Sequence, residues 1–320
     1  MANSLSAVFL DLSTLDRDDL DLAALHAATS QLTTYPTTAA DQRVEHIGEH
    51  QVAITNKVVI DADVMQACPQ LKLILIAATG TNNVDLEAAR RYGITVCNCQ
   101  AYGTSAVAQH TLMLMLVLLT RFEQYRDAVR AGAWQRSEQF CLLDYPIGEL
   151  AGRRLGILGY GELGRAVARL AEAFGMTVLV GALPGRERSG RLALEELLPQ
   201  VDVLSLHCPL TDTTRGLIGE PELALMKPGS FLVNAARGGL VDEPALSASL
   251  TSGHLAGAAV DVLSQEPPRE GNVLLDQQVP NLIVTPHSAW GSREARQRIV
   301  EQLAENVRAF GEGVPRRVVS

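Results

Sequence analysis

The chain has 320 residues, of which 47% are hydrophobic and 20% charged, and its formal net charge is −9 at pH 7. This length fits two domains with sizeable cores, and the acidic balance disfavours nucleic acid and anionic membranes as partners. The N-terminal stretch has no basic region and its apolar run stops at Asp11, so it does not resemble a signal peptide. We therefore expect a cytoplasmic enzyme or binding protein with no nucleic-acid or membrane partner.

The five cysteines are scattered through apolar or strand-like contexts, and an odd number does not indicate a disulfide framework. Cys97 and Cys99 have a spacing that also occurs in metal sites. However, no second Cys or His pair follows nearby at the spacing of a zinc site. We therefore expect buried thiols and no metal.

Short apolar runs alternate with helical patterns in the first part of the chain. Strands are predicted at residues 7–12, 52–55, 71–78 and 94–98. A helical pattern between the last two strands ends at Gly93, a residue type that often terminates helices. This alternation predicts an α/β fold with a parallel sheet covered by helices on both faces.

A long helix is predicted at residues 105–124, and an irregular connection follows at 130–150. A second alternating series then predicts strands at 154–159, 177–181, 202–207, 230–235, 255–262 and 281–286, with an amphipathic helix at 292–310. Six strands of this kind fit a Rossmann sheet.

A glycine-rich turn joins the first strand of the second series to a helix. The pattern Gly159-x-Gly161-x-x-Gly164 would allow a tight turn, a close approach of a pyrophosphate and close packing of helix on strand. The alternative is glycines used for turning and packing alone. The strand–turn–helix context favours a dinucleotide-binding turn formed by Gly159, Tyr160, Gly161, Glu162, Leu163 and Gly164.

Three chemically versatile residues follow the ends of later strands: Arg237, Glu266 and His287. Because ligand crevices of open α/β sheets form at the carboxyl edge, we expect these residues to converge there. A histidine exchanges protons near neutral pH, a carboxylate beside it orients the ring, and a guanidinium binds a substrate carboxylate. Together with the glycine turn, they predict hydride transfer between a 2-hydroxy acid and a nicotinamide.

The motifs that carry these residues resemble those of the D-isomer-specific 2-hydroxyacid dehydrogenases. They are GYGELG, HCPLTDTTRGLI, MKPGSFLVNAARGGLVDEPAL, DVLSQEPP and TPHSA, with ATGTNNVDL in the first part of the chain. The resemblance is greatest to the glycerate dehydrogenase (hydroxypyruvate reductase) branch. It implies a flavodoxin-like substrate domain at 1–103 and 288–320, an inserted Rossmann domain at 104–287, and a homodimer formed largely through the latter.

The same resemblance implies roles for individual residues. Arg237, Glu266 and His287 match the catalytic positions, with Arg237 and His287 also touching the substrate, and the Thr79–Gly80 turn matches the loop that receives the substrate carboxylate. Further positions match residues that line the cofactor: Val107, Cys208, Pro209, Ala235, Ala236 and Asp261, the last facing the nicotinamide amide. Gln109 departs from the glutamate that many members carry.

The cofactor is expected to be NAD(P). The acid that usually holds the adenosine ribose falls near Ala182 in this sequence, which removes a charge that would repel a 2′-phosphate. Arg186 and Arg188 follow closely and would pair with such a phosphate. The alternative is that both arginines are solvated loop charges, with Glu187 between them.

Reduction of hydroxypyruvate or glyoxylate to the D-2-hydroxy acid is the expected reaction. The alternatives are another D-2-hydroxyacid dehydrogenase, such as a phosphoglycerate-type enzyme, and a dinucleotide-sensing corepressor without catalysis. Turnover of small 2-keto acids would distinguish the enzymes from the corepressor.

Overall fold

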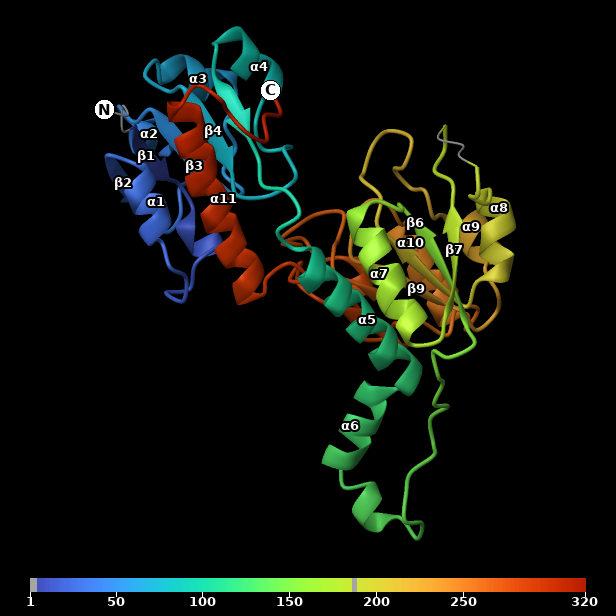
Figure 1. Ribbon diagram of the computed structural model, residues 1–320. Helices are drawn as coiled ribbons and strands as arrows, with labels where there is room; N and C mark the ends of the chain where they lie inside the picture. Colours follow the sequence, from blue (N-terminus) through green and yellow to red (C-terminus); the bar gives the residue numbers. More distant parts are fainter. Residues whose placement is uncertain (1–4, 186–188) are drawn as a thin grey trace. The chain divides into compact units, whose positions relative to one another are not determined.

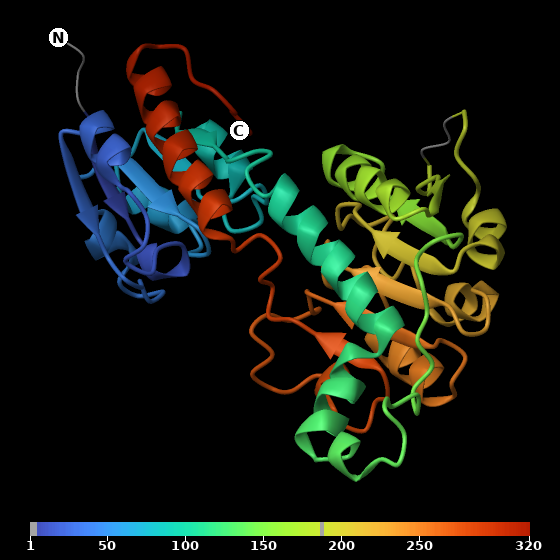
Figure 2. The ribbon, with the colours of Figure 1, turned by 60° about the horizontal axis from the view of Figure 1, so that its bottom comes forward.

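The computed structural model describes residues 5–185 and 189–320. Contacts divide the chain into two compact units (Figures 1 and 2). The first unit contains the residues up to Gly103 together with Gly291–Ser320, and the second is Thr104–Trp290. Each unit is built on its own parallel sheet, which confirms the expected α/β class.

The first unit has a five-stranded sheet in the order β2-β1-β3-β4-β5. Its strands are β1 (Ser6–Phe9), β2 (Gln31–Thr34), β3 (Val52–Thr55), β4 (Leu73–Ile76) and β5 (Thr95–Cys97). All neighbouring pairs are parallel, and the order is that of flavodoxin-like folds. The strand predicted at 52–55 has the bounds of β3, and the other three predicted strands are present but shorter. β2 was not predicted because its sequence, QLTT, is polar and only half-buried at the sheet edge.

Helices pack on this sheet: α1 (Ala23–Ala28), α2 (Arg43–Ile47), α3 (Ala62–Ala67), α4 (Leu86–Arg91) and α11 (Arg293–Gly311). Asp61 and Asp85 start α3 and α4 by accepting hydrogen bonds from backbone amides of the first turn. The long α11 returns from the C-terminal part of the chain to pack on α1 and β4. One domain is therefore assembled from both ends of the sequence.

The second unit has a six-stranded parallel sheet in the order β11-β10-β9-β8-β6-β7. Its strands are β6 (Arg154–Leu158), β7 (Thr177–Gly181), β8 (Val203–Leu206), β9 (Phe231–Asn234), β10 (Gly257–Val260) and β11 (Leu282–Val284). The usual Rossmann order places a third strand outside the second. Here a single parallel bridge between Gly181 and Leu192 takes that place.

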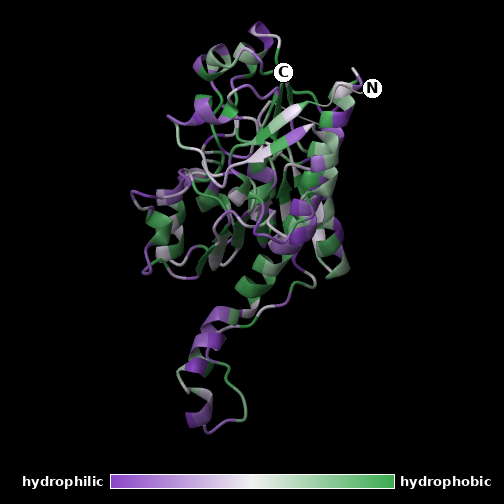
Figure 3. Ribbon diagram, turned by 90° about the vertical axis from the view of Figure 1, so that its left-hand side faces the viewer, coloured by the Kyte–Doolittle hydropathy of each residue, from purple (hydrophilic) through white to green (hydrophobic). Residues whose placement is uncertain are grey.

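Two layers of helices cover the second sheet. On one side α5 (Thr104–Thr120) and α7 (Glu162–Ala173) bury one apolar cluster, and α8 (Leu194–Leu197), α9 (Glu220–Leu225) and α10 (Glu243–Thr251) bury another on the opposite side. Short 3-10 turns occur at Leu12–Thr14, Trp134–Arg136, Leu198–Gln200 and Val273–Leu275. In Figure 3, apolar residues concentrate in the strands and in α5.

The long helix predicted at 105–124 is in fact two helices, α5 and α6 (Phe122–Arg130). Arg121 between them has a left-handed backbone with φ of 53°, and its guanidinium donates to the Ala256 carbonyl. This anchor turns the chain away from the sheet, and no residue of α6 is buried. In the described part of the chain, no single helix is long and apolar enough to cross a membrane. The helices α5 and α6 together have the length and composition of a membrane span, but they are bent by 61° relative to each other.

We predicted a domain boundary after His287, and the second compact unit extends to Trp290. The backbone amides of Ser288 and Ala289 both donate to the Asp261 carboxylate at 2.9 Å. These bonds tie the residues after His287 to the second unit.

Candidate active site

The turn between β6 and α7 has the geometry that a dinucleotide turn requires. Gly159 has a φ of 96°, and a Cβ there would collide with the backbone of His207 and Cys208 at the end of β8. A Cβ at Gly164 would collide with the carbonyl oxygen of Gly159. Both glycines are therefore needed by the fold itself, whether or not a ligand is bound.

Gly161 is different, because a Cβ there would meet no atom within 4 Å. It is the N-cap residue of α7 and offers no side chain to the amides of the first helical turn. Uncapped amides and the positive end of the helix dipole form an anion site. The space at Gly161 and these amides fit the pyrophosphate of a dinucleotide.

The remaining residues of the turn have distinct environments. Glu162 accepts a hydrogen bond from the Thr104 hydroxyl at 2.6 Å, so its carboxylate is already engaged within the protein. Leu163 packs with Val107, Ala235 and Ala289 in a small apolar cluster beside the turn. Three of the predicted cofactor-lining residues thus meet in one place, while Tyr160 is half-buried against the α5–α7 layer.

Cys208, Pro209 and Ala236 line the neighbouring strand ends. Burial raises the pKa of the Cys208 thiol to about 11, so the side chain is a neutral, apolar surface at neutral pH. Pro209 is exposed and Ala236 is 8% exposed. All three side chains are small or apolar, and they follow the ends of β8 and β9.

Glu266 and His287 form a direct pair. The His287 Nδ1 lies 2.6 Å from one Glu266 carboxylate oxygen, and the other oxygen accepts the Leu263 amide at 2.8 Å. About a third of each side chain is exposed. The pair leaves the Nε2 atom of His287 available for proton exchange with a ligand.

Arg237 follows β9, and His287 follows β11, two strands away in the sheet. A Cβ at Gly238 would collide with the Leu263 carbonyl, so the turn after Arg237 lies directly against the loop that bears Glu266. Arg237 is exposed, and one guanidinium nitrogen donates to the Ala236 carbonyl at 2.7 Å. The structure thus brings together the three segments that bear the predicted catalytic residues Arg237, Glu266 and His287.

Two supporting residues were missed by sequence reasoning. Asn234 holds the turn before Arg237 through the Ala236 amide at 3.1 Å and the Arg237 carbonyl at 2.9 Å. Glu243 holds the loop of Glu266 by accepting bonds from Ser264 and Asn272 at 2.7 Å. The sequence offered a sign of the role of Asn234, because it is a polar residue at the end of a buried strand. It offered none for Glu243, which begins a helix.

Asp261 is 1% exposed and organises the segment that carries His287. Its carbonyl accepts the His287 amide at 2.7 Å, and its carboxylate accepts the Thr285 hydroxyl and the amides of Ser288 and Ala289. Its predicted contact with the nicotinamide amide would add to these bonds, because a carboxylate has about four acceptor positions.

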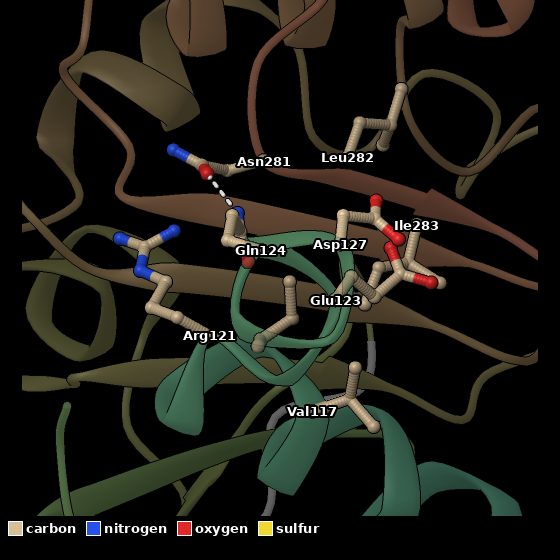
Figure 4. Close-up of a pocket in the computed structure, with 9 residues that line it drawn as sticks. Val117, Arg121, Glu123, Gln124, Asp127, Asn281, Leu282 and Ile283 are labelled. Atoms are coloured by element: carbon tan, nitrogen blue, oxygen red, sulfur yellow. Dashed lines mark hydrogen bonds between the residues drawn. The ribbon is translucent and has the colours of Figure 1, made fainter. Parts of the chain in front are cut away.

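A pocket of about 390 Å³ adjoins the pair of Glu266 and His287. Most of its lining is apolar, and the residues include Leu263, Pro267, Leu275, Val284 and Pro286. A second pocket, of about 190 Å³, lies at the opposite end of β11, where Gln124 of α6 bonds Asn281 (Figure 4). Glu266 and His287, two of the predicted catalytic residues, line the first pocket, at the carboxyl ends of the strands.

Other predicted residues lie elsewhere. Thr79 and Gly80 follow β4 in the first unit, where the Thr79 hydroxyl donates to the Cys99 carbonyl at 2.9 Å. Ala182 follows β7, and its amide donates to the Leu192 carbonyl at 2.8 Å. Arg186 and Arg188 lie outside the described residues. Within the described ranges there is no group of three or more His, Cys, Asp or Glu side chains suited to a metal.

A parallel sheet with an uncapped glycine turn, and a His–Glu pair with an arginine at the same sheet edge, define an oxidoreductase that uses a nicotinamide dinucleotide. Residues 112–289 match the family model for the NAD-binding domain of D-isomer specific 2-hydroxyacid dehydrogenases. The chain belongs to this family, and it interconverts 2-keto acids and D-2-hydroxy acids.

Similar proteins match over nearly their whole length. The glycerate dehydrogenase of Methylorubrum extorquens is 45% identical over 98% of this chain and 98% of its own. The hydroxypyruvate reductase of Blautia hydrogenotrophica is 35% identical, with coverage of 98% and 99%. The TT0316 protein from Thermus thermophilus, known from a crystal structure, has 34% sequence identity to this chain and a TM-score of 0.86. The match covers 99% of this chain and 100% of that protein.

Proposed function

We propose that the enzyme reduces hydroxypyruvate or glyoxylate to the D-2-hydroxy acid. The bond of 2.6 Å between His287 and Glu266 is the observation that carries the catalytic part of this proposal. A bound dinucleotide would supply the hydride for C2, and His287 Nε2 would give a proton to the carbonyl oxygen. Glu266 orients the imidazole through its contact with Nδ1.

Arg237 is proposed to bind the substrate. Its exposed guanidinium offers several N–H donors, of which one bonds Ala236, so it can reach a carboxylate and a carbonyl oxygen. The backbone amides of the Thr79–Gly80 turn are proposed to receive the substrate carboxylate, as the family resemblance implies. The first compact unit, which we predicted as 1–103 and 288–320, would then be the substrate domain, and the second, which we predicted as 104–287, the dinucleotide domain.

The choice of substrate is supported by the two relatives that match this chain end to end. One is a glycerate dehydrogenase and the other a hydroxypyruvate reductase. Glyoxylate lacks the hydroxymethyl group of hydroxypyruvate but presents the same 2-keto carboxylate. Phosphoglycerate-type chemistry remains the alternative among enzymes.

A kinetic panel tests the proposal. The kcat/KM of the purified enzyme would be measured for hydroxypyruvate, glyoxylate, pyruvate and 3-phosphohydroxypyruvate with NADH and with NADPH. We expect hydroxypyruvate or glyoxylate to lead by about tenfold, the discrimination that one well-used polar contact supplies. A lead for the phosphorylated substrate would contradict the assignment.

We propose that NADPH is accepted as well as NADH. Ala182 stands after β7 where an acid would repel a 2′-phosphate, and its side chain carries no charge. Substitution Ala182→Asp should lower kcat/KM for NADPH at least about tenfold and leave that for NADH within a few-fold, through charge repulsion and new ribose contacts. An unchanged ratio of the two values in this variant would overturn the idea, and Ala182→Asn is the uncharged control.

We also propose a cytoplasmic homodimer. All five cysteines are unpaired thiols, which fits a reducing compartment. The segment 122–147, which we call the arm, comprises α6 and the loop after it. It exposes seven large hydrophobic side chains: Phe122, Val129, Trp134, Phe140, Leu143, Tyr145 and Ile147. A second copy of this chain is the proposed partner that covers them.

A further inference from the structure

His110 lies in the middle of α5 and reaches the segment that carries the catalytic histidine. Its Nε2 is 3.1 Å from the Thr285 hydroxyl and 3.6 Å from the nearer carboxylate oxygen of Asp261. The His110 side chain is 15% exposed. Neither the glycine turn nor the catalytic trio accounts for this contact.

Counting protons shows which group donates. A hydroxyl has one proton, and that of Thr285 goes to the Asp261 carboxylate at 2.6 Å. The Thr285 oxygen must therefore accept from His110, which places a proton on His110 Nε2. A one-way chain of hydrogen bonds runs from His110 through Thr285 to Asp261.

Asp261 is the anchor of the segment 285–289. It accepts the Thr285 hydroxyl and the backbone amides of His287, Ser288 and Ala289. His287 itself has a left-handed backbone, with φ of 50°, which is unfavourable for a residue with a side chain. The bonds to Asp261 hold this conformation, and with it the direction from which the ring meets Glu266.

We propose that His110 is a positioning residue for His287. By donating to Thr285 it fixes the hydroxyl that donates to Asp261, and so keeps the segment 285–289 in the conformation that presents the imidazole. Without that donor the hydroxyl can rotate away from Asp261, and the strained backbone at His287 loses one of its restraints. This inference rests on the proposed role of His287 as the proton donor.

The test compares His110→Leu, which removes the donor, with His110→Gln, whose amide can still donate to Thr285. Leu should lower kcat for hydroxypyruvate about tenfold, with the Kd of the reduced dinucleotide within about threefold, as expected for a loss felt mainly in the transition state. Gln should restore kcat to within about threefold of the unmodified enzyme. The primary isotope effect with dinucleotide deuterated at the transferred position should rise for Leu, which a mere loss of folded enzyme would not cause.

Variants of Thr285 provide a second line that does not depend on the folding of the His110 variants. Thr285→Val should match His110→Leu, whereas Thr285→Ser should stay near the unmodified enzyme. The double variant His110→Leu/Thr285→Val should be no slower than Thr285→Val alone, because both break one chain. Additive losses, equal losses in Leu and Gln, or a kcat within twofold for Leu would overturn the proposal.

The variant His287→Ala distinguishes a failure of the proposed catalytic role of His287 from a failure of the positioning role of His110. If it keeps near-normal turnover, the proposed role of His287 is wrong. If it is inactive while His110→Leu and Thr285→Val are fully active, the catalytic role stands and the positioning role of His110 falls.

Discussion

At the scale of single residues, the pair of His287 and Glu266 is the most informative feature of the molecule. Replacement His287→Ala removes the proposed proton donor and should lower kcat about 10²- to 10⁴-fold, the usual contribution of general acid–base catalysis. The Kd of the reduced dinucleotide, followed by its fluorescence, should stay within about threefold, because the glycine turn is untouched.

Glu266→Gln is the matched comparison for this variant. Its amide can still bond the imidazole and orient the ring, so its loss of kcat should be smaller than that of His287→Ala. Equal kcat in the Ala variant and the unmodified enzyme would remove His287 from the mechanism.

At the scale of elements, local sequence patterns predicted most of what was found. The strands on which the site depends have continuous apolar runs, and all of them were predicted, with ends that extended a few residues into the following turns. β2 was missed because it is a polar edge strand, and the break at Arg121 was missed because the helical pattern runs through it. The break depends on a contact with Ala256, far away in sequence, that no local pattern encodes.

The β6–α7 turn allows a prediction that separates folding from binding. Gly159→Ala should lower Tm by several degrees. The new Cβ would collide with the backbone after β8, and alanine is strained at the positive φ of 96° that Gly159 adopts. Gly161→Val should leave Tm within about 2 °C, since open space surrounds that position, but raise the Kd of the dinucleotide at least about tenfold. Calorimetry and fluorescence titration check the two values, and a Gly161 variant that binds normally would contradict the assignment.

At the scale of the whole molecule, the candidate site joins residues that the sequence keeps far apart. Arg237, Glu266 and His287 could be predicted because each follows a strand of one parallel sheet, and such ends share an edge. His110 and Thr285 could not, because their contact depends on how α5 crosses the sheet. The positions of supporting side chains follow from packing, which is a property of the fold and not of any local motif.

The arm is the feature of the whole molecule that a single chain leaves unexplained. Figures 1 and 2 show α6 and the loop after it standing away from the sheet of their own unit. Phe140 is 90% exposed and Leu143 76% exposed, which is costly for apolar side chains in water. A second copy that covers the arm would remove this cost.

The double variant Phe140→Asp/Leu143→Asp should therefore shift the protein from dimer to monomer. Each buried charge would oppose association by several kcal/mol, enough to raise the dimer Kd by orders of magnitude. Sedimentation equilibrium or light scattering at micromolar concentration measures the mass directly. Val59→Asp is the matched control, because Val59 is 50% exposed in the first unit, outside the arm, and its substitution should leave the dimer intact. A monomeric unmodified protein, or a dimer that survives both Asp substitutions, would overturn the role of the arm in dimerisation.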